Sequence, residues 1–411
     1  MDVKKQFAQE EEQKEEEKPP SYHPRPERPW RVAVIANVKG ETALPIDAPA
    51  DAGAEFDRKE TIQAIQAAIE LGGHTTQFLS ADHTLLDTVR AYRPDICFNI
   101  AEGLMGDGRE GHVPSLLELL RIPYTASRVL ANAVGLDKVM TKHIWRDHGL
   151  PTAPFQEFVT GYEALDSDLQ FPLFVKPSRE GTGMGMDSKS IVCSENELRD
   201  QVQWVINSYH QPALVETYLP GREFTIGVLG RNDVAQWSRH PALYRADGFH
   251  RFPVLEVDSN HAVTPGVYGH TAKMFQPGEQ GAPSYICPAT VDCDLAEEMR
   301  SLAIRAHNAI GALDVSRVDI RLDDSGRPRL LEINTLPGLT PDYSDLCIIS
   351  KAEGLSYADL ILEILYLGAS RWNLLAQPQM QLGIPVRTRR LVRMPIRVLA
   401  QRGKVSRLSF K

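Results

Sequence analysis

The chain has 411 residues, enough for two or three domains, and its composition is ordinary for a globular protein. A formal net charge of −9 argues against a general nucleic-acid binder. No apolar run is long enough to span a bilayer, no secretory signal opens the chain, and the 5 cysteines are scattered without a Cys-x-x-Cys pair. We therefore expect a cytoplasmic protein with reduced thiols.

The two ends of the chain differ in charge. Residues 1–30 combine an acidic run with several prolines, and they hold too few apolar side chains to offset the entropy of ordering. We predict a disordered acidic tail there. Residues 371–411 are interpreted as a basic tail, because Lys and Arg occur without any acid from Arg387 onward. This tail could be peripheral, pair with the acidic run, or bind an anionic partner.

Strand and helix patterns alternate between residues 31 and 130. Buried-strand patterns cover 30–37, 75–79 and 94–100, with helical patterns over 61–71 and 85–92, which predicts a small parallel α/β domain. The third strand runs into a glycine-rich turn that contains Glu102. Ligands of such sheets gather at the carboxyl ends of the strands, so Glu102 is a candidate site residue. The alternative is a solvated turn acid.

A helix is predicted from Leu136 to about His148, and a strand over residues 171–177 then ends in Lys176-Pro177. The glycine-rich segment that follows frees backbone N–H groups to face an anion, and Lys176 adds a positive charge. This segment is not a Walker A loop, because no Gly-Lys-Ser/Thr closes it. The glycines at alternate positions are Gly181, Gly183 and Gly185.

The next helix is predicted over Glu195–Ser208, after a Ser194 cap. Further on, the pattern predicts a strand over 252–257 and a loop over 261–275. Helices are expected over 294–311 and 357–367.

Between those last two helices, a hairpin is predicted from two strand-like runs around the turn Asp323-Asp324-Ser325-Gly326. Side chains two apart share a face of a strand, so Asp319, Glu332 and Asn334 should lie together. These hard oxygen ligands suit Mg²⁺. The alternative is a surface hairpin with scattered acids.

The hairpin also carries a family resemblance. Arg317-Val318-Asp319, followed by Glu332-Ile333-Asn334-Thr335-Leu336-Pro337-Gly338, resembles the metal-binding signature of D-alanine–D-alanine ligases, in the ATP-grasp superfamily. The resemblance covers about residues 31–370. It implies an α/β ATP-grasp fold with an N-terminal parallel α/β substrate domain (31–130), a central subdomain (131–218) and a C-terminal catalytic subdomain (219–370).

The resemblance also implies roles for individual residues. It implies ATP at Lys138, Lys176, Gly181, Thr182, Gly183, Gly185, Glu216, Tyr218, Leu219 and Glu223, and Mg²⁺ or Mn²⁺ at Asp319, Glu332 and Asn334. Glu216, Tyr218 and Leu219 would contact the adenine, and Glu223 the ribose. Arg317 and the Gly338 N–H would stabilise an oxyanion, and Lys273 would belong to a lid. Tyr343 or Ser344 would bind a substrate carboxylate. The catalytic candidates are Arg317, Gly338, Lys273 and Glu102.

The activity implied is ATP-dependent ligation of an acid and an amino acid through an acyl phosphate, which yields ADP, phosphate and an amide. Three departures predict an acid other than D-alanine. Glu41 is at best a loose substitute for the usual glutamate after the first strand, Thr182-Gly183 replaces Ser-Ser, and Met274 replaces a tyrosine.

The first candidate activity of such a ligase is D-alanine–D-alanine-like dipeptide formation for peptidoglycan. A close rival is a ligase of secondary metabolism that joins an amino acid to a mycosporine-type core, which would explain the altered acid site. A third is a non-catalytic nucleotide-binding regulatory protein, against which the retained ATP and metal residues argue. The net acidity disfavours a nucleic-acid or membrane-surface role for the basic tail. The expected partners are small-molecule substrates, and a homodimer is left open.

Overall fold

The computed structural model describes residues 26, 28–46, 48–232, 239–258, 265–275, 279 and 282–375. The chain divides into a unit of residues 1–376 and a second unit, 377–411, which lies outside the described residues together with most of the predicted acidic tail. Folded structure is described at the inner end of each predicted tail, at Trp30 and at Arg371. Trp30 is 4% exposed and stacks on His74, and the last helix continues past Leu367 to Arg371.

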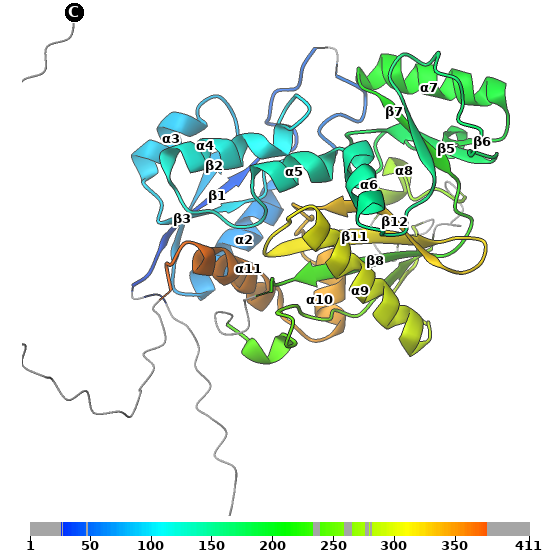
Figure 1. Cartoon of the computed structure of the whole chain (residues 1–411). Coiled ribbons are helices and arrows are strands. Elements are labelled where there is room, and N and C mark those ends of the chain that lie inside the picture. Colours follow the sequence, from blue (N-terminus) through cyan, green and yellow to red (C-terminus); the bar gives the residue numbers. More distant parts are fainter. Residues whose placement is uncertain are drawn as a thin grey trace, which may run out of the picture. The chain divides into compact units, whose positions relative to one another are not determined.

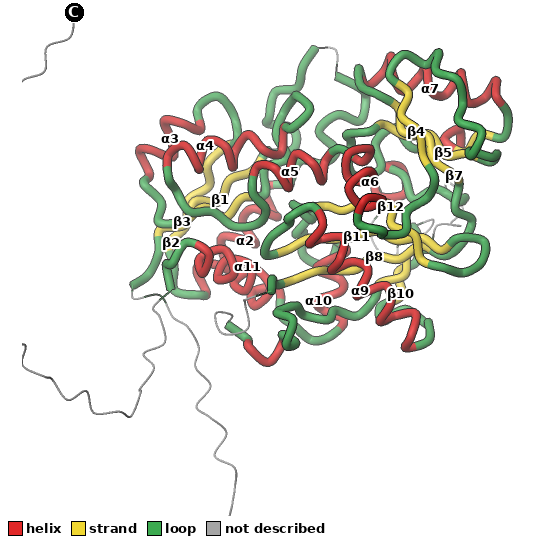
Figure 2. Tube along the Cα trace, in the orientation of Figure 1, coloured by secondary structure: helices red, strands yellow, loops and turns green. Residues whose placement is uncertain are grey.

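A three-stranded parallel sheet with the order β2-β1-β3 forms the N-terminal region, as the alternating pattern predicted (Figure 1). The middle strand is buried along nearly its whole length, which explains its continuous apolar sequence. Long loops follow β1 and β3 (Figure 2). The elements are β1 (Arg31–Ala36), α2 (Lys59–Leu71), β2 (Thr75–Ser80), α3 (Leu85–Tyr92), β3 (Ile96–Asn99) and α4 (His112–Leu120).

Two helices lead from this sheet to the next one. The first, α5 (Val129–Leu136), was not predicted, because its nearly continuous apolar sequence lacks a clear helical period. The second, α6 (Lys138–Asp147), begins two residues after the predicted start at Leu136. The reason is that Asp137 is its N-cap and accepts a hydrogen bond from the Met140 N–H at 2.9 Å.

A four-stranded antiparallel sheet follows, in the order β4-β7-β5-β6. The buried stripe Leu198, Val202 and Val205 of α7 packs on this sheet. The Ser194 cap is confirmed, because its side chain accepts from the Glu197 N–H at 3.4 Å. The elements are β4 (Phe155–Phe158), β5 (Leu173–Pro177), β6 (Ile191–Val192), α7 (Glu195–Tyr209) and β7 (Ala213–Thr217).

The third sheet has five antiparallel strands in the order β10-β9-β8-β11-β12. It contains the predicted hairpin as β11 and β12, with Asp319 opposite Glu332 and a register shift directly after Asp319. The predicted loop 261–275 contains a short helix, α8, in its described part. The elements are β8 (Glu223–Leu229), β9 (Leu255–Val257), α8 (His270–Lys273), β10 (Tyr285–Ile286), α9 (Cys293–Ala309), β11 (Val315–Leu322), β12 (Pro328–Asn334), α10 (Asp345–Ala352) and α11 (Tyr357–Arg371).

Short 3₁₀ helices complete the inventory at Arg109–Gly111, Ser188–Ser190 and Pro241–Leu243. Within the residues that the structure describes, no helix combines the length and the apolar character needed to cross a bilayer.

Candidate active site

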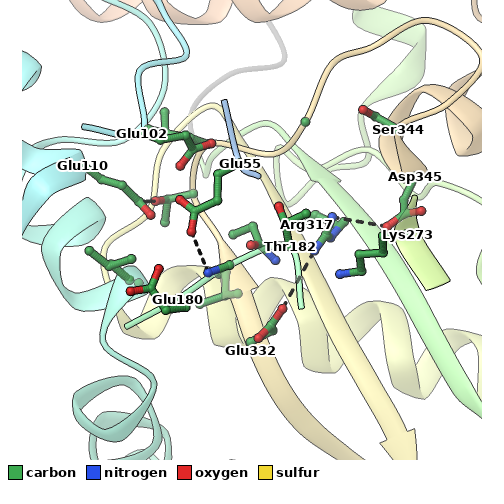
Figure 3. Close-up of a pocket in the computed structure, with 18 of the residues that line it drawn as sticks. Glu55, Glu102, Glu110, Glu180, Thr182, Lys273, Arg317, Glu332, Ser344 and Asp345 are labelled. Atoms are coloured by element: carbon green, nitrogen blue, oxygen red, sulfur yellow. Dashed lines mark hydrogen bonds and ion pairs between the residues drawn. The ribbon is translucent and has the colours of Figure 1, made fainter. Parts of the chain in front are cut away.

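The residues singled out from the sequence, except Gly185, line three adjoining cavities in the described part of the chain. The first has a volume of about 130 Å³ and is drawn in Figure 3. It shares Lys138, Lys273 and Glu332 with the second cavity, and the second shares Lys176 and Glu223 with the third. The cavities therefore form one continuous row.

The predicted residues are distributed along this row. The first cavity is lined by Glu102, Lys138, Gly181, Thr182, Lys273, Arg317, Glu332, Asn334, Gly338, Tyr343 and Ser344. The second adds Lys176, Gly183, Glu223 and Asp319, and the third adds Glu216, Tyr218 and Leu219. Gly185 lines none of the three.

The hairpin brings the predicted oxygen ligands together. Asp319 and Glu332 are directly opposite each other on paired strands, and the Asn334 Nδ2 lies 3.4 Å from Asp319 Oδ2. Thr225 donates to the other oxygen of Asp319 at 2.8 Å, and Arg317 contacts Asp319 at 2.9 Å. Asp319 lines the second cavity and Glu332 lines the first and the second, so two carboxylates border the row of cavities, and carboxylate oxygens are ligands that Mg²⁺ prefers.

No group of three or more His, Cys, Asp or Glu side chains is arranged to hold a metal anywhere in the described residues. A cation at the hairpin would therefore have two carboxylates and an amide from the protein and would need further oxygens from phosphate or water. That sparse ligand set is typical of magnesium bound together with a nucleotide.

Positive charge surrounds Glu332. Burial alone would raise the pKa of its carboxyl, but Lys138, Lys176, Lys273 and Arg317 outweigh burial and hold that pKa well below its usual range. Glu332 is therefore ionised at neutral pH. The same cations give this end of the site the charge needed to hold a polyphosphate.

Glu216 is held between two lysines at the next cavity. Its oxygens lie 2.8 Å from Lys142 Nζ and 2.8 Å from Lys176 Nζ, and the residue is 2% exposed. Burial would raise the pKa of Glu216, but the two ammonium groups lower it to about 2. Glu216 also lines the third cavity beside Tyr218 and Leu219, which is where the predicted adenine contact would require it. Its role at the adenine stays a prediction.

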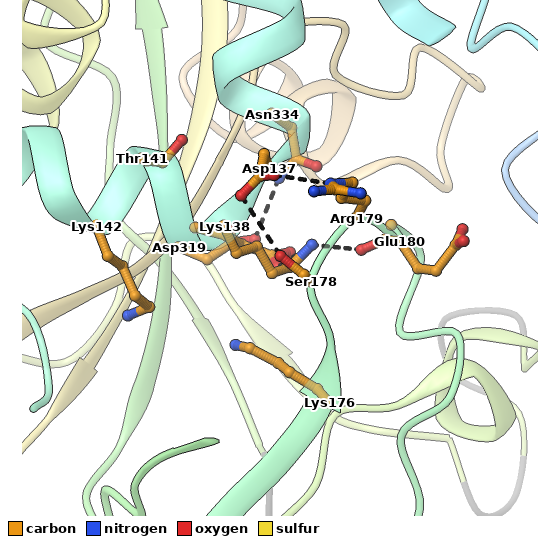
Figure 4. A network of polar contacts seen from close by, with 12 residues as sticks. Asp137, Lys138, Thr141, Lys142, Lys176, Ser178, Arg179, Glu180, Asp319 and Asn334 are labelled. Atoms are coloured by element: carbon orange, nitrogen blue, oxygen red, sulfur yellow. Dashed lines mark hydrogen bonds and ion pairs between the residues drawn. The ribbon is translucent and has the colours of Figure 1, made fainter. Parts of the chain in front are cut away.

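The start of α6 is fixed to the start of the glycine-rich loop (Figure 4). Asp137 accepts from Arg179 Nε at 2.7 Å, and the Lys138 N–H donates to the Ser178 carbonyl at 3.0 Å. The Lys138 ammonium group reaches the Glu180 carbonyl and lies 3.4 Å from Glu332. This arrangement points Lys138 toward the hairpin. Asp137 was missed as a positioning residue, although an Asp before a helix is a recognisable cap signal.

Sequence reasoning also missed an acidic region at the far end of the first cavity. Glu55, Glu110 and Glu180 line it together with the predicted Glu102. Arg109 lies 2.9 Å from Glu55 and 3.1 Å from Glu180. Burial raises the pKa of Glu110 to about 7, and burial with the neighbouring carboxylates also raises the pKa of Glu102.

Glu55, and not Glu41, is the acid that the loop after β1 brings to the site. Its Oε1 accepts from the Gly181 N–H at 2.8 Å. Glu41 is exposed and pairs with Lys59 outside the three cavities. No local motif marks Glu55, and the only signal was the unusual length of its loop.

Tyr343 and Ser344, the candidates for binding a substrate carboxylate, line the same cavity as Lys273, the predicted lid residue. The Tyr343 hydroxyl donates to the Lys273 carbonyl, and the Ser344 hydroxyl accepts from the Thr340 N–H at 3.0 Å. A Cβ on Gly338 would lie 2.9 Å from Ser344 Oγ, so a larger residue at this position would displace the Ser344 hydroxyl. Lys273 Nζ lies 4.7 Å from the centre of the Tyr268 ring.

Comparisons of sequence connect this site with known proteins. A family profile described as "D-ala D-ala ligase C-terminus" matches residues 144–366. An uncharacterised protein of Sinorhizobium fredii is 33% identical over 317 residues, covering 75% of this chain and 87% of that protein. A D-alanine–D-alanine ligase of Hydrogenovibrio crunogenus is 30% identical over 83% of this chain and 96% of its own length.

A comparison with solved structures bears on the fold. The crystal structure of a D-alanine–D-alanine ligase from Bacillus anthracis complexed with ATP matches 84% of this chain and 99% of its own chain, with a TM-score of 0.61 and 21% identity. This likeness confirms the predicted fold class. The chain therefore belongs to the D-alanine–D-alanine ligase family and is an ATP-dependent ligase with the ATP-grasp fold.

Proposed function

We propose that the protein activates a carboxylate substrate with ATP and transfers the acyl group to an amino acid, releasing ADP and phosphate. One observation carries this proposal: Lys138, Lys273 and Glu332 line both the first cavity, which contains the acidic region, and the second cavity, which contains Lys176 and Asp319. A carboxylate in the first cavity would therefore lie beside a γ-phosphate in the second. Such closeness is what direct phosphoryl transfer requires.

The nucleotide would lie along the row of cavities. In this arrangement the adenine borders Glu216, Tyr218 and Leu219, and the ribose hydroxyls bind Glu223. The phosphates lie between Lys138, Lys176 and the glycine-rich loop of Gly181, Thr182, Gly183 and Gly185. Support comes from the shared lining of the cavities and from the positive charge around Glu332.

Asp319, Glu332 and Asn334 would hold Mg²⁺ or Mn²⁺, which would neutralise charge on the phosphates. Arg317 is pinned by Asp319 at 2.9 Å and by Asp345 at 3.2 Å, so its guanidinium is already oriented before any substrate binds. We propose that Arg317 and the Gly338 N–H stabilise the oxyanion that forms when the amine attacks the acyl phosphate. One such fixed donor contributes roughly 3–4 kcal/mol in other enzymes.

We propose that the acid substrate is an amino acid whose ammonium group binds the acidic region around Glu55 and Glu102. Carboxylates outnumber cations at that end of the cavity. The pKa values of Glu102 and Glu110 are raised there, and a bound cation would lower them by stabilising the ionised carboxylates. Met274 is 65% exposed, so its side chain does not join a hydrogen-bonded group around the substrate. This difference favours an acid other than D-alanine. Tyr343 and Ser344 are the candidates for the carboxylate of the second substrate.

The proposed boundaries near residues 130 and 218 separate three regions with one sheet each. The parallel sheet β1–β3, the sheet β4–β7 and the sheet β8–β12 each fall within one region. We also propose a reducing, cytoplasmic setting, for which the support is that all five cysteines are free, from Cys97 to Cys347.

The test is ADP release with Mg²⁺-ATP across a panel of amino acids, including D-alanine, with the amide product identified by mass spectrometry. Turnover with D-alanine alone would support a peptidoglycan role, and turnover with another acid would support a different pathway. Glu332→Gln should abolish turnover while leaving the circular dichroism spectrum unchanged. Asp324→Asn, an exposed acid in the turn of the same hairpin, is the matched control. Wild-type activity in Glu332→Gln would refute the metal assignment.

A further inference from the structure

The loop between β1 and α2 crosses to the glycine-rich loop and holds it at both ends. The Glu55 carboxylate accepts from the Gly181 N–H at 2.8 Å. The Asp51 carboxylate accepts from the Gly185 N–H at 3.0 Å. Two carboxylates from one segment therefore bind the first and last glycines of the loop.

Asp51 has a second partner on the helix behind the loop. The hydroxyl of Tyr209, the last residue of α7, lies 2.9 and 2.8 Å from the two oxygens of Asp51. Burial and the nearby Asp51 raise the pKa of Tyr209, so the phenol stays protonated and remains a donor. Asp51 thus connects three separate segments: the loop after β1, the glycine-rich loop and the end of α7.

The centre of the glycine-rich loop is left for a ligand. Across the described residues, the N–H groups of Thr182 and Gly183 have no protein acceptor, while Thr182 lines the first cavity and Gly183 the second. Both residues have a positive φ, 50° and 69° respectively, and form a tight turn in which the Met184 N–H donates to the Gly181 carbonyl at 3.0 Å; N–H groups in such turns can bind an anion. The loop is therefore fixed at its ends and open to an anion at its middle.

Little space remains around this loop. A Cβ on Gly185 would lie 2.6 Å from Pro177 and 3.0 Å from the Tyr209 ring. On the opposite side, the Gly183 carbonyl accepts from the His270 N–H at 2.9 Å, which joins the loop to the described part of the lid. Releasing one of these contacts would let the loop move away from the cavities.

We propose that Asp51 and Tyr209 are positioning residues that latch the glycine-rich loop over the nucleotide phosphates. The proposal rests on the proposed function, because it places ATP beneath that loop. The latch supplies the closure that this chain lacks at Thr182-Gly183 and Met274, where the family resemblance would lead one to expect Ser-Ser and Tyr.

The latch has a chemical consequence for the acyl phosphate. With the loop open, water adds to the acyl carbon, the bond from that carbon to the phosphate oxygen breaks, and the free acid and inorganic phosphate are released. ATP is then consumed without formation of an amide. A closed loop excludes that water and binds the phosphates more tightly.

The experiment compares Tyr209→Phe and Asp51→Ala with the control Tyr162→Phe, in which an 86% exposed tyrosine loses its hydroxyl. The measurements are the KM for ATP, kcat, and the ratio of ADP to amide. Losing a hydrogen bond to a carboxylate should raise the KM for ATP about tenfold and raise the ADP-to-amide ratio above one, with a smaller change in kcat. Asp51→Asn keeps one acceptor oxygen and should lie between wild type and Asp51→Ala.

A second measurement does not need turnover. Hydrogen–deuterium exchange of a peptide that spans residues 181–186 should be faster in nucleotide-free Tyr209→Phe than in wild type. Unchanged exchange, KM and product ratio in a folded Tyr209→Phe would overturn the latch. If wild type releases no ADP with any substrate pair, the proposed function fails, and the exchange experiment still decides whether the latch exists.

Discussion

Glu216→Gln would remove the single negative charge between two buried ammonium groups. In the wild type, Glu216 is 2% exposed and lies 2.8 Å from both Lys142 Nζ and Lys176 Nζ, and the Lys142 side chain is 0% exposed. The substitution preserves the size of the side chain and removes only its charge. Lys142 and Lys176 then lose the carboxylate in direct contact with both of them, and Glu332, which also acts on both lysines, makes no ion pair with either in the described residues.

The cost follows from that geometry. Removing one partner of a buried ion pair typically destabilises a protein by about 3–5 kcal/mol, and we expect the free energy of unfolding to fall by that amount at pH 7. Burial already lowers the pKa of Lys142, and without Glu216 this pKa falls further. The unfolded chain, with a lysine pKa of 10.5, then binds more protons than the folded one. The free energy of unfolding of the variant therefore rises with pH, and the difference in this free energy between wild type and variant becomes smaller toward pH 10.

The assay is urea unfolding of the nucleotide-free protein, followed by circular dichroism at neutral and alkaline pH. The double variant Lys142→Met/Glu216→Gln removes one charge of each sign and should be more stable than Glu216→Gln alone. A Glu216→Gln protein within about 1 kcal/mol of wild type would refute the reasoning. A difference in the free energy of unfolding between wild type and Glu216→Gln that stays constant from pH 7 to pH 10 would also refute it.

Two further predictions concern other parts of the fold. Burial lowers the pKa of His307 from 6.5 to about 3, so the unfolded chain takes up this proton first as the pH falls. Between pH 7 and pH 5 the wild type should lose about 2 kcal/mol of stability through this group. His307→Gln should lose that much less in urea unfolding, and an equal loss in both proteins would contradict the assignment. Gly183→Ala would place a Cβ 2.6 Å from the backbone of Gly269, so this substitution should raise the KM for ATP. The control is Gly149→Ala, because Gly149 also has a positive φ but has open space around it, and this substitution should leave the KM for ATP unchanged.

Local patterns were enough to predict several parts of the site. The hairpin β11–β12 was predicted, because its strands are separated only by a short Asp- and Gly-containing turn. The returning strand was expected to bring Glu332 and Asn334 near Asp319, and Asp319 pairs with Glu332, but the register shift after Asp319 was not predicted. The glycine-rich loop after Lys176 and the Ser194 cap were found for the same reason, since each depends on residues only a few positions apart.

Other features could not be predicted because their partners are distant in the chain. Glu55 is 126 residues from Gly181, and Asp51 is 158 residues from Tyr209. Neither acid belongs to a periodic pattern or a turn motif, so nothing in the neighbouring sequence distinguishes it from a solvated acid. Glu41 was considered instead only because it lies closer to β1.

The sequence by itself determined the kind of chemistry, through the oxygen ligands of the hairpin, the lysines and the glycine-rich loop. These features are set by side-chain alternation and turn geometry within short segments. The tertiary structure alone decided which acids line the first cavity and which side chains contact the two ends of the glycine-rich loop. Those contacts depend on where a long loop crosses the molecule, and that path is fixed by the packing of whole sheets rather than by the loop's own residues.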